Sequence, residues 1–414
     1  MATTVQRRVM SAGPAHRRWS AFVALLLVVL LLVGLRRVTT ESTPPLLIHR
    51  SLPAYVRLSG GPPTLAWPEE GQAAVEVEGL GGLGVSGGST PVPIASVAKV
   101  MTAYLTLRAH PLAAGQEGFS VTITAADAAE EEQRERLGES TLNVRAGERL
   151  SERQMLQALM LPSANNIAAL LARWDAGGIV PFVARMNTAA RALGMASSTY
   201  TDPSGFNDQT VSTATDQLKL AHAAMRIPTF AEIVGQSSVV LPVVGRVANY
   251  NGLVGEDGYM GVKTGSDRAA GGCLVFAKKV FVDGRALTVL GVVLSQRGGS
   301  LIGAALDTAR RLGDSAAASL RLRTALRAGT VVLSAKSVDG RGTTAITSGA
   351  LHAIGWGGER VGVHVLARPA MTTLKAGERM ASVSLLGGAV RSTWALANSA
   401  VGVSSFGWRL RHLF

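Results

Sequence analysis

The stretch Pro93-Ile94-Ala95-Ser96-Val97-Ala98-Lys99-Val100-Met101-Thr102-Ala103-Tyr104 places a hydroxyl and an amine three residues apart at the expected start of a helix. The prolines in and just before it exclude a helix there, and the apolar residues 100–107 are typical of a core helix. Ser96 and Lys99 therefore share one face of the first turn. Serine needs a base to remove its proton, and lysine can act as one only when it is neutral. The stretch predicts a nucleophile, Ser96, with Lys99 as its base, provided that burial or a second cation lowers the pKa of Lys99.

A purely structural alternative exists for the same pair, with Ser96 capping the helix and Lys99 exposed to solvent. The chain has 41 basic residues, but only seven of them are lysines, so arginine is its usual cation. Among those seven lysines, the S-x-x-K spacing occurs once. Because lysine is rare in this chain, its presence at this position favours the catalytic interpretation.

The composition is that of a folded protein. With 414 residues, 47% of them hydrophobic, the chain is long enough for two or three domains. The net charge of +13 favours a polyanionic neighbour. Because the arginines are scattered rather than grouped with aromatic residues, we expect anionic lipid or wall polymer, and no nucleic acid. The single cysteine, Cys273, excludes an intramolecular disulfide, and its apolar neighbours are typical of a buried strand.

The first part of the chain is typical of an export segment. Residues 1–20 are basic and contain no acid, which predicts a cytoplasmic N-terminus. Residues 21–37 are predicted to be a signal or anchor, because fifteen small or apolar residues are followed by two arginines. No clear small-residue cleavage site follows, so we expect an uncleaved anchor; a cleaved signal and a secreted protein are the alternative. Residues 38–59 are predicted to be a tether.

Residues 60–313 alternate between strand and helix signals and are predicted to form one domain. Two glycine patterns within residues 82–88, G-x-G-x-x-G and G-x-S-x-G, would need a helix directly after them, and the following Ser-Thr-Pro-Val-Pro cannot form one, so a hairpin loop is expected. The charged run of a helix over 125–136 is interpreted as a solvated face with possible salt bridges rather than as a metal site. A capping box is predicted at Ser151. The domain is predicted to end with three adjacent antiparallel strands and a helix, over residues 258–265, 271–277, 286–294 and 301–312.

Residues 320–410 show a different pattern. Short alternating segments are separated by glycine-containing turns, and no long helix signal intervenes. This predicts a small β-rich C-terminal domain, a sandwich or a barrel. The alternation at 407–411 is typical of one more strand.

Three short patterns stand in order along residues 60–313. Ser96-x-x-Lys99 lies at a helix start, Ser163-Ala164-Asn165 in a loop between two helices, and Lys263-Thr264-Gly265 on a strand. In this order and context they resemble the motifs shared by penicillin-binding proteins and serine β-lactamases. The residues around them, 94–103, 161–166 and 186–195, resemble the low-molecular-mass penicillin-binding proteins of the D-alanyl-D-alanine carboxypeptidase family. The resemblance implies an α+β fold, an antiparallel sheet flanked by helices, with a small all-β C-terminal domain.

The resemblance also implies an acyl transfer in cell-wall synthesis and remodelling, at the outer face of the bacterial cytoplasmic membrane. Ser96 would attack the penultimate D-alanine carbonyl of a peptidoglycan pentapeptide that ends in D-Ala-D-Ala, with Lys99 as its base. Ser163 would relay a proton to the leaving amine. Asn165 would orient the substrate amide and the lysine.

The third pattern would bind the substrate. Lys263 would supply the positive field that keeps the base neutral and attracts the substrate carboxylate, to which Thr264 would hydrogen-bond. The backbone N–H groups of Ser96 and of Ser266, which follows Gly265, would form the oxyanion hole. β-Lactam antibiotics would be covalent inhibitors, and no metal or other cofactor is implied.

The same residues are compatible with three other functions. A class A β-lactamase uses a glutamate between the second and third motifs, and Glu232 and Glu256 lack its sequence context. A D,D-endopeptidase would use the same site. A catalytically silent, wall-binding scaffold is favoured by Asp267, an acid where the substrate carboxylate should lie. The arginine that some relatives place nearby has Arg297 and Arg268 as its candidates.

Overall fold

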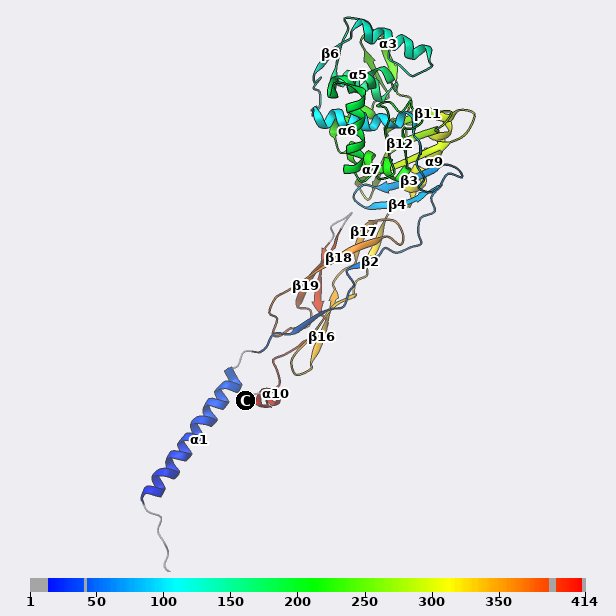
Figure 1. Ribbon diagram of the computed structural model, residues 1–414. Helices are drawn as coiled ribbons and strands as arrows, with labels where there is room; N and C mark the ends of the chain where they lie inside the picture. Colours follow the sequence, from blue (N-terminus) through cyan, green and yellow to red (C-terminus); the bar gives the residue numbers. More distant parts are fainter. Residues whose placement is uncertain (1–13, 41–42, 387–391, 412–414) are drawn as a thin grey trace, which may run out of the picture. The chain divides into compact units, whose positions relative to one another are not determined.

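The computed structural model describes residues 14–40, 43–386 and 392–411 (Figure 1). The chain forms two compact units. The larger unit consists of residues 57–323 and 353–359, and the smaller unit of the described parts of residues 1–56, 324–352 and 360–414. The sequence-predicted boundaries are 60, 313 and 320. The main difference is that residues before 57 contribute strands to the smaller unit.

The larger unit is built on a five-stranded antiparallel sheet with the strand order β11-β12-β13-β3-β4. The strands are β3 (Gln72–Val77), β4 (Gly81–Ser86), β11 (Tyr259–Asp267), β12 (Gly271–Val282) and β13 (Arg285–Gln296). On β12, Cys273 and Val275 belong to the core beneath the helices, whereas Leu274 and Phe276 pack toward α9 (Leu301–Ser319). Both faces of the sheet are therefore buried. This confirms the predicted antiparallel strands and the buried cysteine.

Helices form the rest of this unit, with α5, α6 and α7 gathered on one side of the sheet (Figure 1). The helical segments are the 3-10 turn η1 (Ala95–Ala98), α2 (Lys99–Ala109), α3 (Ala125–Arg136), α4 (Glu152–Met160), α5 (Asn165–Ala176), α6 (Ile179–Ala192), α7 (Ala214–Met225) and α8 (Pro228–Val234). Met101, Leu159 and Phe182 are fully buried among them. Burying a side chain of this size stabilises the fold by about 1.5–3 kcal/mol.

Two local predictions in this unit are tested by the structure. The Ser151 capping box closes α4, because the Gln154 N–H donates to Ser151 Oγ (3.1 Å) and the Ser151 N–H donates to Gln154 Oε1 (2.9 Å). The glycine-rich residues 82–88 are not followed directly by a helix, as predicted, but the expected hairpin loop is wrong for residues 81–86, which form strand β4 itself, paired with β3. Three short two-stranded ladders complete the unit: β5 (Val92–Pro93) with β8 (Val211–Ser212), β6 (Ser120–Thr122) with β7 (Arg149–Ser151), and β9 (Ser238–Leu241) with β10 (Gly245–Ala248).

The smaller unit contains a seven-stranded sheet with the order β1-β15-β16-β20-β19-β18-β2. Its edge strands, β1 (Leu47–Arg50) and β2 (Tyr55–Arg57), are separated by four residues of chain. Such a connection spans at most about 18 Å, whereas the edges of a flat seven-stranded sheet lie about 29 Å apart. The sheet must therefore curl, and the Arg50 guanidinium donates to the Val363 carbonyl on β18 (Arg360–Ala367), 2.8 Å away. The β-rich C-terminal prediction is confirmed.

The remaining strands follow in the C-terminal part of the chain. They are β14 (Arg321–Leu326), β15 (Val331–Lys336), β16 (Gly342–Thr347), β17 (Leu351–Gly355), β19 (Arg379–Leu386) and β20 (Ser392–Ala397), with β14 and β17 forming a separate pair.

Two expectations for the chain's ends differ from the structure. Part of the tether expected over 38–59 is strand, because residues 47–57 pair with β15 and β18, partners far along the chain that local alternation does not reveal. The strand predicted at 407–411 is wrong: these residues belong to helix α10 (Phe406–Arg411). Five residues are too few to distinguish a helical from a strand period.

Helix α1 (Pro14–Thr40) contains the predicted anchor segment 21–37. Its residues 18–37 are long and apolar enough to cross a membrane, and none of this stretch is buried against the rest of the protein. The apolar side chains exposed along it include Leu27, Leu31 and Leu35. Residues 1–13, with two arginines of the predicted cytoplasmic segment, lie outside the described residues.

Candidate active site

Ser96 lies on a tight turn that two glycines surround closely. Its neighbour Ala95 has φ 44°, a conformation that residues with a Cβ seldom adopt and that the surroundings must hold. A Cβ added to Gly205 would lie 1.9 Å from the Ala95 carbonyl oxygen, and one added to Gly265 would lie 2.9 Å from the Ser96 nitrogen. Glycine at these two positions therefore lets two other segments pack against the turn that carries Ser96.

Lys99, the first residue of α2, is fully buried. Its Nζ lies 2.8 Å from Ser96 Oγ, 2.6 Å from Asn165 Oδ1 and 3.0 Å from the Ser204 carbonyl oxygen. A neutral amine has two N–H groups and one lone pair. Because the amide and carbonyl oxygens only accept hydrogen bonds, they take both N–H groups and leave the lone pair to the Ser96 hydroxyl. This arrangement suits Lys99 as a base for Ser96.

The surroundings also disfavour the charged form of this amine. Burial and, after it, the positive charge of Lys263 lower the pKa of Lys99 well below its ordinary value. Asp202 and Glu139 act in the opposite direction. Lys263, on β11, is buried as well, and burial lowers its pKa to about 7. Both amines therefore bind protons less tightly than exposed lysines, and the S-x-x-K chemistry needs this of Lys99.

The second pattern begins with a strained residue. Ser163 has φ 68°, and its buried Oγ has no hydrogen-bond partner among the described residues. The Lys263 Nζ likewise has none within the described part of the chain. A buried polar group without a partner costs about 1–3 kcal/mol of stability. A bound polar ligand would satisfy both groups.

The third pattern reaches the first through strand β11. Lys263, Thr264 and Gly265 are consecutive buried residues, and Ser266 after them is half-buried. Because a Cβ on Gly265 would lie only 2.9 Å from the Ser96 nitrogen, β11 runs beside the nucleophile turn. The structure thus brings the three predicted patterns together from η1 and α2, the α4–α5 loop, and β11.

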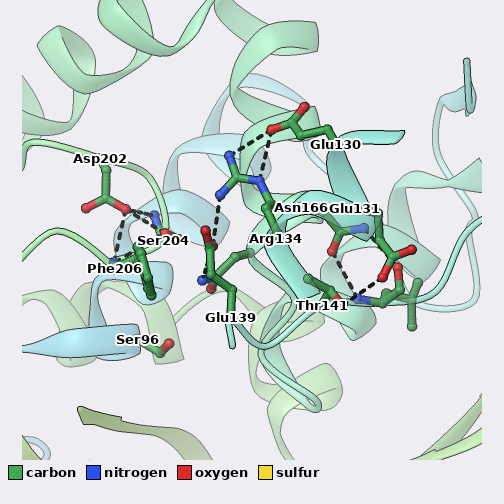
Figure 2. Close-up of polar contacts among 12 residues, drawn as sticks. Ser96, Glu130, Glu131, Arg134, Glu139, Thr141, Asn166, Asp202, Ser204 and Phe206 are labelled. Atoms are coloured by element: carbon green, nitrogen blue, oxygen red, sulfur yellow. Dashed lines mark hydrogen bonds and ion pairs between the residues drawn. The ribbon is translucent and has the colours of Figure 1, made fainter. Parts of the chain in front are cut away.

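The turn at residues 202–205 supplies one hydrogen-bond acceptor for Lys99. The Asp202 carboxylate accepts hydrogen bonds from the Ser204 N–H (3.0 Å), the Ser204 hydroxyl (2.5 Å), the Phe206 N–H (3.1 Å) and the Thr210 hydroxyl (2.8 Å). Figure 2 shows Asp202 bonded to Ser204 and Phe206, and these bonds hold the turn whose Ser204 carbonyl contacts Lys99. The sequence Asp-Pro-Ser-Gly predicted the turn, but a backbone carbonyl leaves no sequence signal.

The charged run of α3 is a second feature that sequence reasoning missed. Glu131 is only 2% exposed and accepts a hydrogen bond from the Thr141 hydroxyl (2.8 Å). Arg134 donates to Glu139 (2.9 Å), and Glu139 accepts from Asn165 Nδ2 (2.7 Å). Figure 2 shows Glu131 with Thr141 and Arg134 with Glu139. The expectation of a solvated face is therefore wrong for Glu131, because the loop after α3 folds back over it, whereas the ion pair of Arg134 with Glu130 (2.7 Å) is one of the expected salt bridges.

The side chain of Asp267 faces its own turn. Its carboxylate accepts from the Ala270 N–H (2.6 Å) at the β11–β12 connection, and burial raises its pKa. The Arg297 guanidinium donates to the carbonyl oxygens of Arg268 (2.9 Å) and Ala269 (3.1 Å) on the same turn. Arg297 and Asp267 therefore both brace the hairpin end next to the third pattern.

The sequence of residues 86–295 matches the family described as D-alanyl-D-alanine carboxypeptidase, over slightly more than half of the chain. The chain belongs to this family. All three patterns lie inside the matched region, as do the Asp202 turn and Glu139.

Individual members of the family show the same similarity. A D-alanyl-D-alanine endopeptidase of Escherichia coli is 33% identical over 44% of this chain and 58% of its own length. A D-alanyl-D-alanine carboxypeptidase of Streptomyces sp. is 33% identical over 36% of this chain and 56% of its own length. The chain thus spans a little over half the length of these two relatives.

Solved structures of the family agree with the fold. The Streptomyces K15 DD-transpeptidase aligns over 62% of this chain and 98% of its own, with 28% identity and a TM-score of 0.53. A D-alanyl-D-alanine carboxypeptidase from Francisella tularensis aligns over 83% of this chain and 96% of its own, with a TM-score of 0.57. At 19% identity the latter likeness concerns the fold alone.

Proposed function

We propose that this family member is a serine D-alanyl-D-alanine carboxypeptidase that removes the terminal D-alanine from peptidoglycan stem peptides through an acyl-enzyme. The observation that carries the proposal is the geometry of Lys99. Its Nζ lies 2.8 Å from Ser96 Oγ, and two oxygen acceptors occupy its N–H groups. A buried amine held in this way is a base for one neighbour, the Ser96 hydroxyl.

The acylation step follows from these positions. Ser96 Oγ attacks the carbonyl of the penultimate D-alanine while its proton passes to Lys99. Charge builds up on the carbonyl oxygen, and the backbone N–H groups of Ser96 and Ser266 stabilise it. The C–N bond then breaks, and the leaving D-alanine takes a proton through Ser163, whose hydroxyl is free for this role. Water hydrolyses the ester, with its proton returning through the same base.

Recognition of the substrate carboxylate is assigned to the third motif. A carboxylate is the natural partner for the buried, unpartnered Lys263 Nζ, because binding it would restore the charge that burial disfavours. Thr264, buried beside it on β11, would add a hydrogen bond. β-Lactam antibiotics, which carry a carboxylate near a reactive carbonyl, would acylate Ser96 by the same route.

A D,D-endopeptidase is the second candidate function. It is favoured by the similarity to the endopeptidases of Escherichia coli and Pseudomonas aeruginosa, which are 33% and 37% identical over the matched residues. The same site would cut the same kind of bond, but the leaving group would be a crosslinked side chain rather than free D-alanine.

The β-lactamase and scaffold alternatives find less support. Glu232 pairs with Arg153 (2.7 Å) and Glu256 with Arg310, so both glutamates between the second and third motifs are engaged elsewhere. Asp267, which favoured a silent scaffold, is turned into its own hairpin. Its position is therefore compatible with an anionic substrate.

We further propose that α1 anchors the enzyme at the outer face of the cytoplasmic membrane. The support is the apolar stretch of residues 18–37 together with the arginines before it. The peptidoglycan substrate lies on that side of the membrane, where the larger unit would work.

The test is the intact mass of the protein lacking residues 1–44, before and after benzylpenicillin, with Ser96→Ala in parallel. We expect one covalent adduct on the wild-type protein and none on the variant. Release of free D-alanine from a pentapeptide then separates the carboxypeptidase from the endopeptidase. A folded protein that neither gains mass nor consumes the antibiotic would support the silent scaffold.

A further inference from the structure

Residues 138–142, which follow α3, contact the second motif at three points. The Asn165 N–H donates to the Ser140 carbonyl (2.7 Å), and Asn165 Nδ2 donates to Glu139 Oε2 (2.7 Å). The side-chain amide of Asn166 exchanges two hydrogen bonds with the backbone of Leu142 (3.0 and 2.9 Å). The loop therefore fixes both the backbone and the side chains at the start of α5.

Glu139 is built into this position. Its side chain is 4% exposed, its N–H donates to the Arg134 carbonyl (3.0 Å), and its carboxylate is paired with the Arg134 guanidinium (2.9 Å). Arg134 is held from its other side by Glu130 (2.7 Å). Arg134 therefore binds two carboxylates, Glu130 and Glu139 (Figure 2), of which Glu139 accepts from Asn165.

The chemistry of the two groups decides which way the Asn165 amide points. An ionised carboxylate only accepts hydrogen bonds, so it must face the NH2 group of the asparagine. Asn165 Oδ1 is then left facing Lys99, 2.6 Å from Nζ. With the amide turned over, Nδ2 would donate to the lone pair of Lys99, and the lysine could no longer take the proton of Ser96.

We propose that Glu139 is a positioning residue for acyl transfer: by accepting from Asn165 Nδ2 it holds Asn165 Oδ1 toward Lys99 and so directs the lone pair of Lys99 to Ser96. The proposal rests on the proposed function, since it concerns the step in which Lys99 acts as a base. It gives the charged run of α3 a role in the reaction, because Arg134 holds the carboxylate in place.

The charge of Glu139 has a second, separable effect. The charged groups that act on Lys99 are Lys263 on β11, Asp202 on its turn, and the pair of Glu139 and Arg134. Glu139 raises the pKa of Lys99, so removing its charge lowers that pKa. Because the neutral amine is the active form, the rise of the acylation rate with pH, the acid limb of its pH profile, should then move to lower pH.

Three variants of the full chain in detergent separate these effects. Glu139→Ala removes both the acceptor and the charge; Glu139→Gln keeps an acceptor oxygen but loses the charge. Glu130→Gln is the matched control, because it weakens the same Arg134 without touching Asn165. The measurement is the second-order rate constant of acylation by a fluorescent penicillin from pH 5 to 10, with thermal unfolding of each variant alongside.

We expect the plateau rate of Glu139→Ala to fall about 10–100-fold, as expected when a catalytic group loses its orientation. Glu139→Gln should stay within about threefold of the wild-type plateau while its acid limb moves to lower pH, and Glu130→Gln should change neither. If all three variants keep the wild-type plateau rate and the wild-type acid limb of the pH profile, the proposal is overturned. If Glu139→Ala fails to fold, Glu139→Met, which fills similar space without an acceptor, takes its place, and a wild-type plateau rate in folded Glu139→Met overturns the proposal. Failure of the proposed function is distinct, because the wild-type protein would then show no acylation.

Discussion

At the scale of single residues, two buried lysines make the free energy of unfolding depend on pH. Lys99 is 0% and Lys263 is 1% exposed, and burial lowers the pKa of both. In the unfolded chain each amine keeps its ordinary pKa near 10.5. The unfolded state therefore binds more protons than the folded state between about pH 7 and 10, and the free energy of unfolding must rise with pH in that window.

This linkage can be measured on Lys263. We expect the free energy of unfolding to rise between pH 7 and 10, with each buried amine contributing at most about 1.4 kcal/mol per pH unit. Lys263→Met removes one such group, so urea unfolding of this variant should show a shallower rise. Lys279→Met, at an exposed position, is the control. Identical slopes in the wild type and Lys263→Met would contradict the lowered pKa.

Lys99→Arg should abolish acylation. The variant keeps the positive charge, but a guanidinium does not lose its proton at these pH values, so Ser96 has no base. The readout is the intact mass after benzylpenicillin, with thermal unfolding to confirm a folded variant. A substantial adduct on folded Lys99→Arg would refute the role of Lys99.

Ser163→Ala should separate stability from activity. The buried Ser163 hydroxyl has no partner among the described residues, so its removal should leave the melting temperature equal to or above that of the wild type. If the hydroxyl relays the proton to the leaving group, D-alanine release should fall about 100-fold or more. Ser198→Ala, which breaks real hydrogen bonds to Ser212 and Asp216, should instead lower the melting temperature. Unchanged D-alanine release in Ser163→Ala would exclude the relay.

The sequence could predict the reacting side chains of the site better than the groups that hold them in place. Ser96, Lys99, Ser163, Asn165 and Lys263 stand in short patterns whose spacing relates them to one chemistry. The Ser204 carbonyl could not be predicted, because every residue has one. Glu139 lies beside a run of charges that is typical of solvated helices, and only the fold shows that it turns inward.

At the scale of elements, the close approach of β11 to η1 decides the geometry of the site. Gly265→Ala would place a Cβ 2.9 Å from the backbone nitrogens of Ser96 and Val97 and 3.0 Å from the Ile94 carbonyl oxygen. Backbone atoms cannot yield as a side chain can, so β11 must move away from the nucleophile. We expect acylation by benzylpenicillin to fall about 100-fold or more. Gly82→Ala, on β4 with no atom within 4 Å of the added Cβ, should acylate normally, and normal rates in both variants would contradict this account.

Elements that depend on local signals were predictable, and elements that depend on distant partners were not. The caps and apolar spacing of α4 and the continuous apolar run of β12 come from their own residues. Strands β1 and β2 are short and mostly exposed, and they become strands only because β15 and β18 offer them free edges. These partner strands lie nearly 300 residues further along the chain.

For the whole molecule, the place where the chain is cut should decide whether the curled sheet survives. A protein that starts at residue 60, the sequence-predicted boundary, lacks both edge strands, whereas one that starts at residue 45 keeps them. We expect the shorter protein to expose β15 and β18 and to be cut faster by trypsin within residues 324–414. Acylation of Ser96 should persist in both, because the larger unit remains. Equal digestion of the two proteins would show that the edge strands contribute little.

The charge of the molecule is unevenly distributed along the chain. Residues 320–414 contain 12 Lys and Arg against 3 Asp and Glu, whereas residues 57–319 contain 22 against 24. The protein lacking residues 1–44 should therefore still bind vesicles of anionic lipid, with little binding to zwitterionic ones and with loss of binding in about 0.5 M salt. Sedimentation with vesicles measures this, and salt-independent binding would exclude an electrostatic origin.

The curled sheet also determines the order in which the protein can be completed. Strands β1 and β2 are made first, but β15 and β18 follow only after some 270 further residues. During synthesis residues 57–323 of the larger unit are made before β15 and β18, so the sheet closes last, over a long loop of chain. A polypeptide interrupted before residue 331 would carry two unmatched strands. Only a finished chain therefore covers the exposed strand edges that proteases and chaperones recognise.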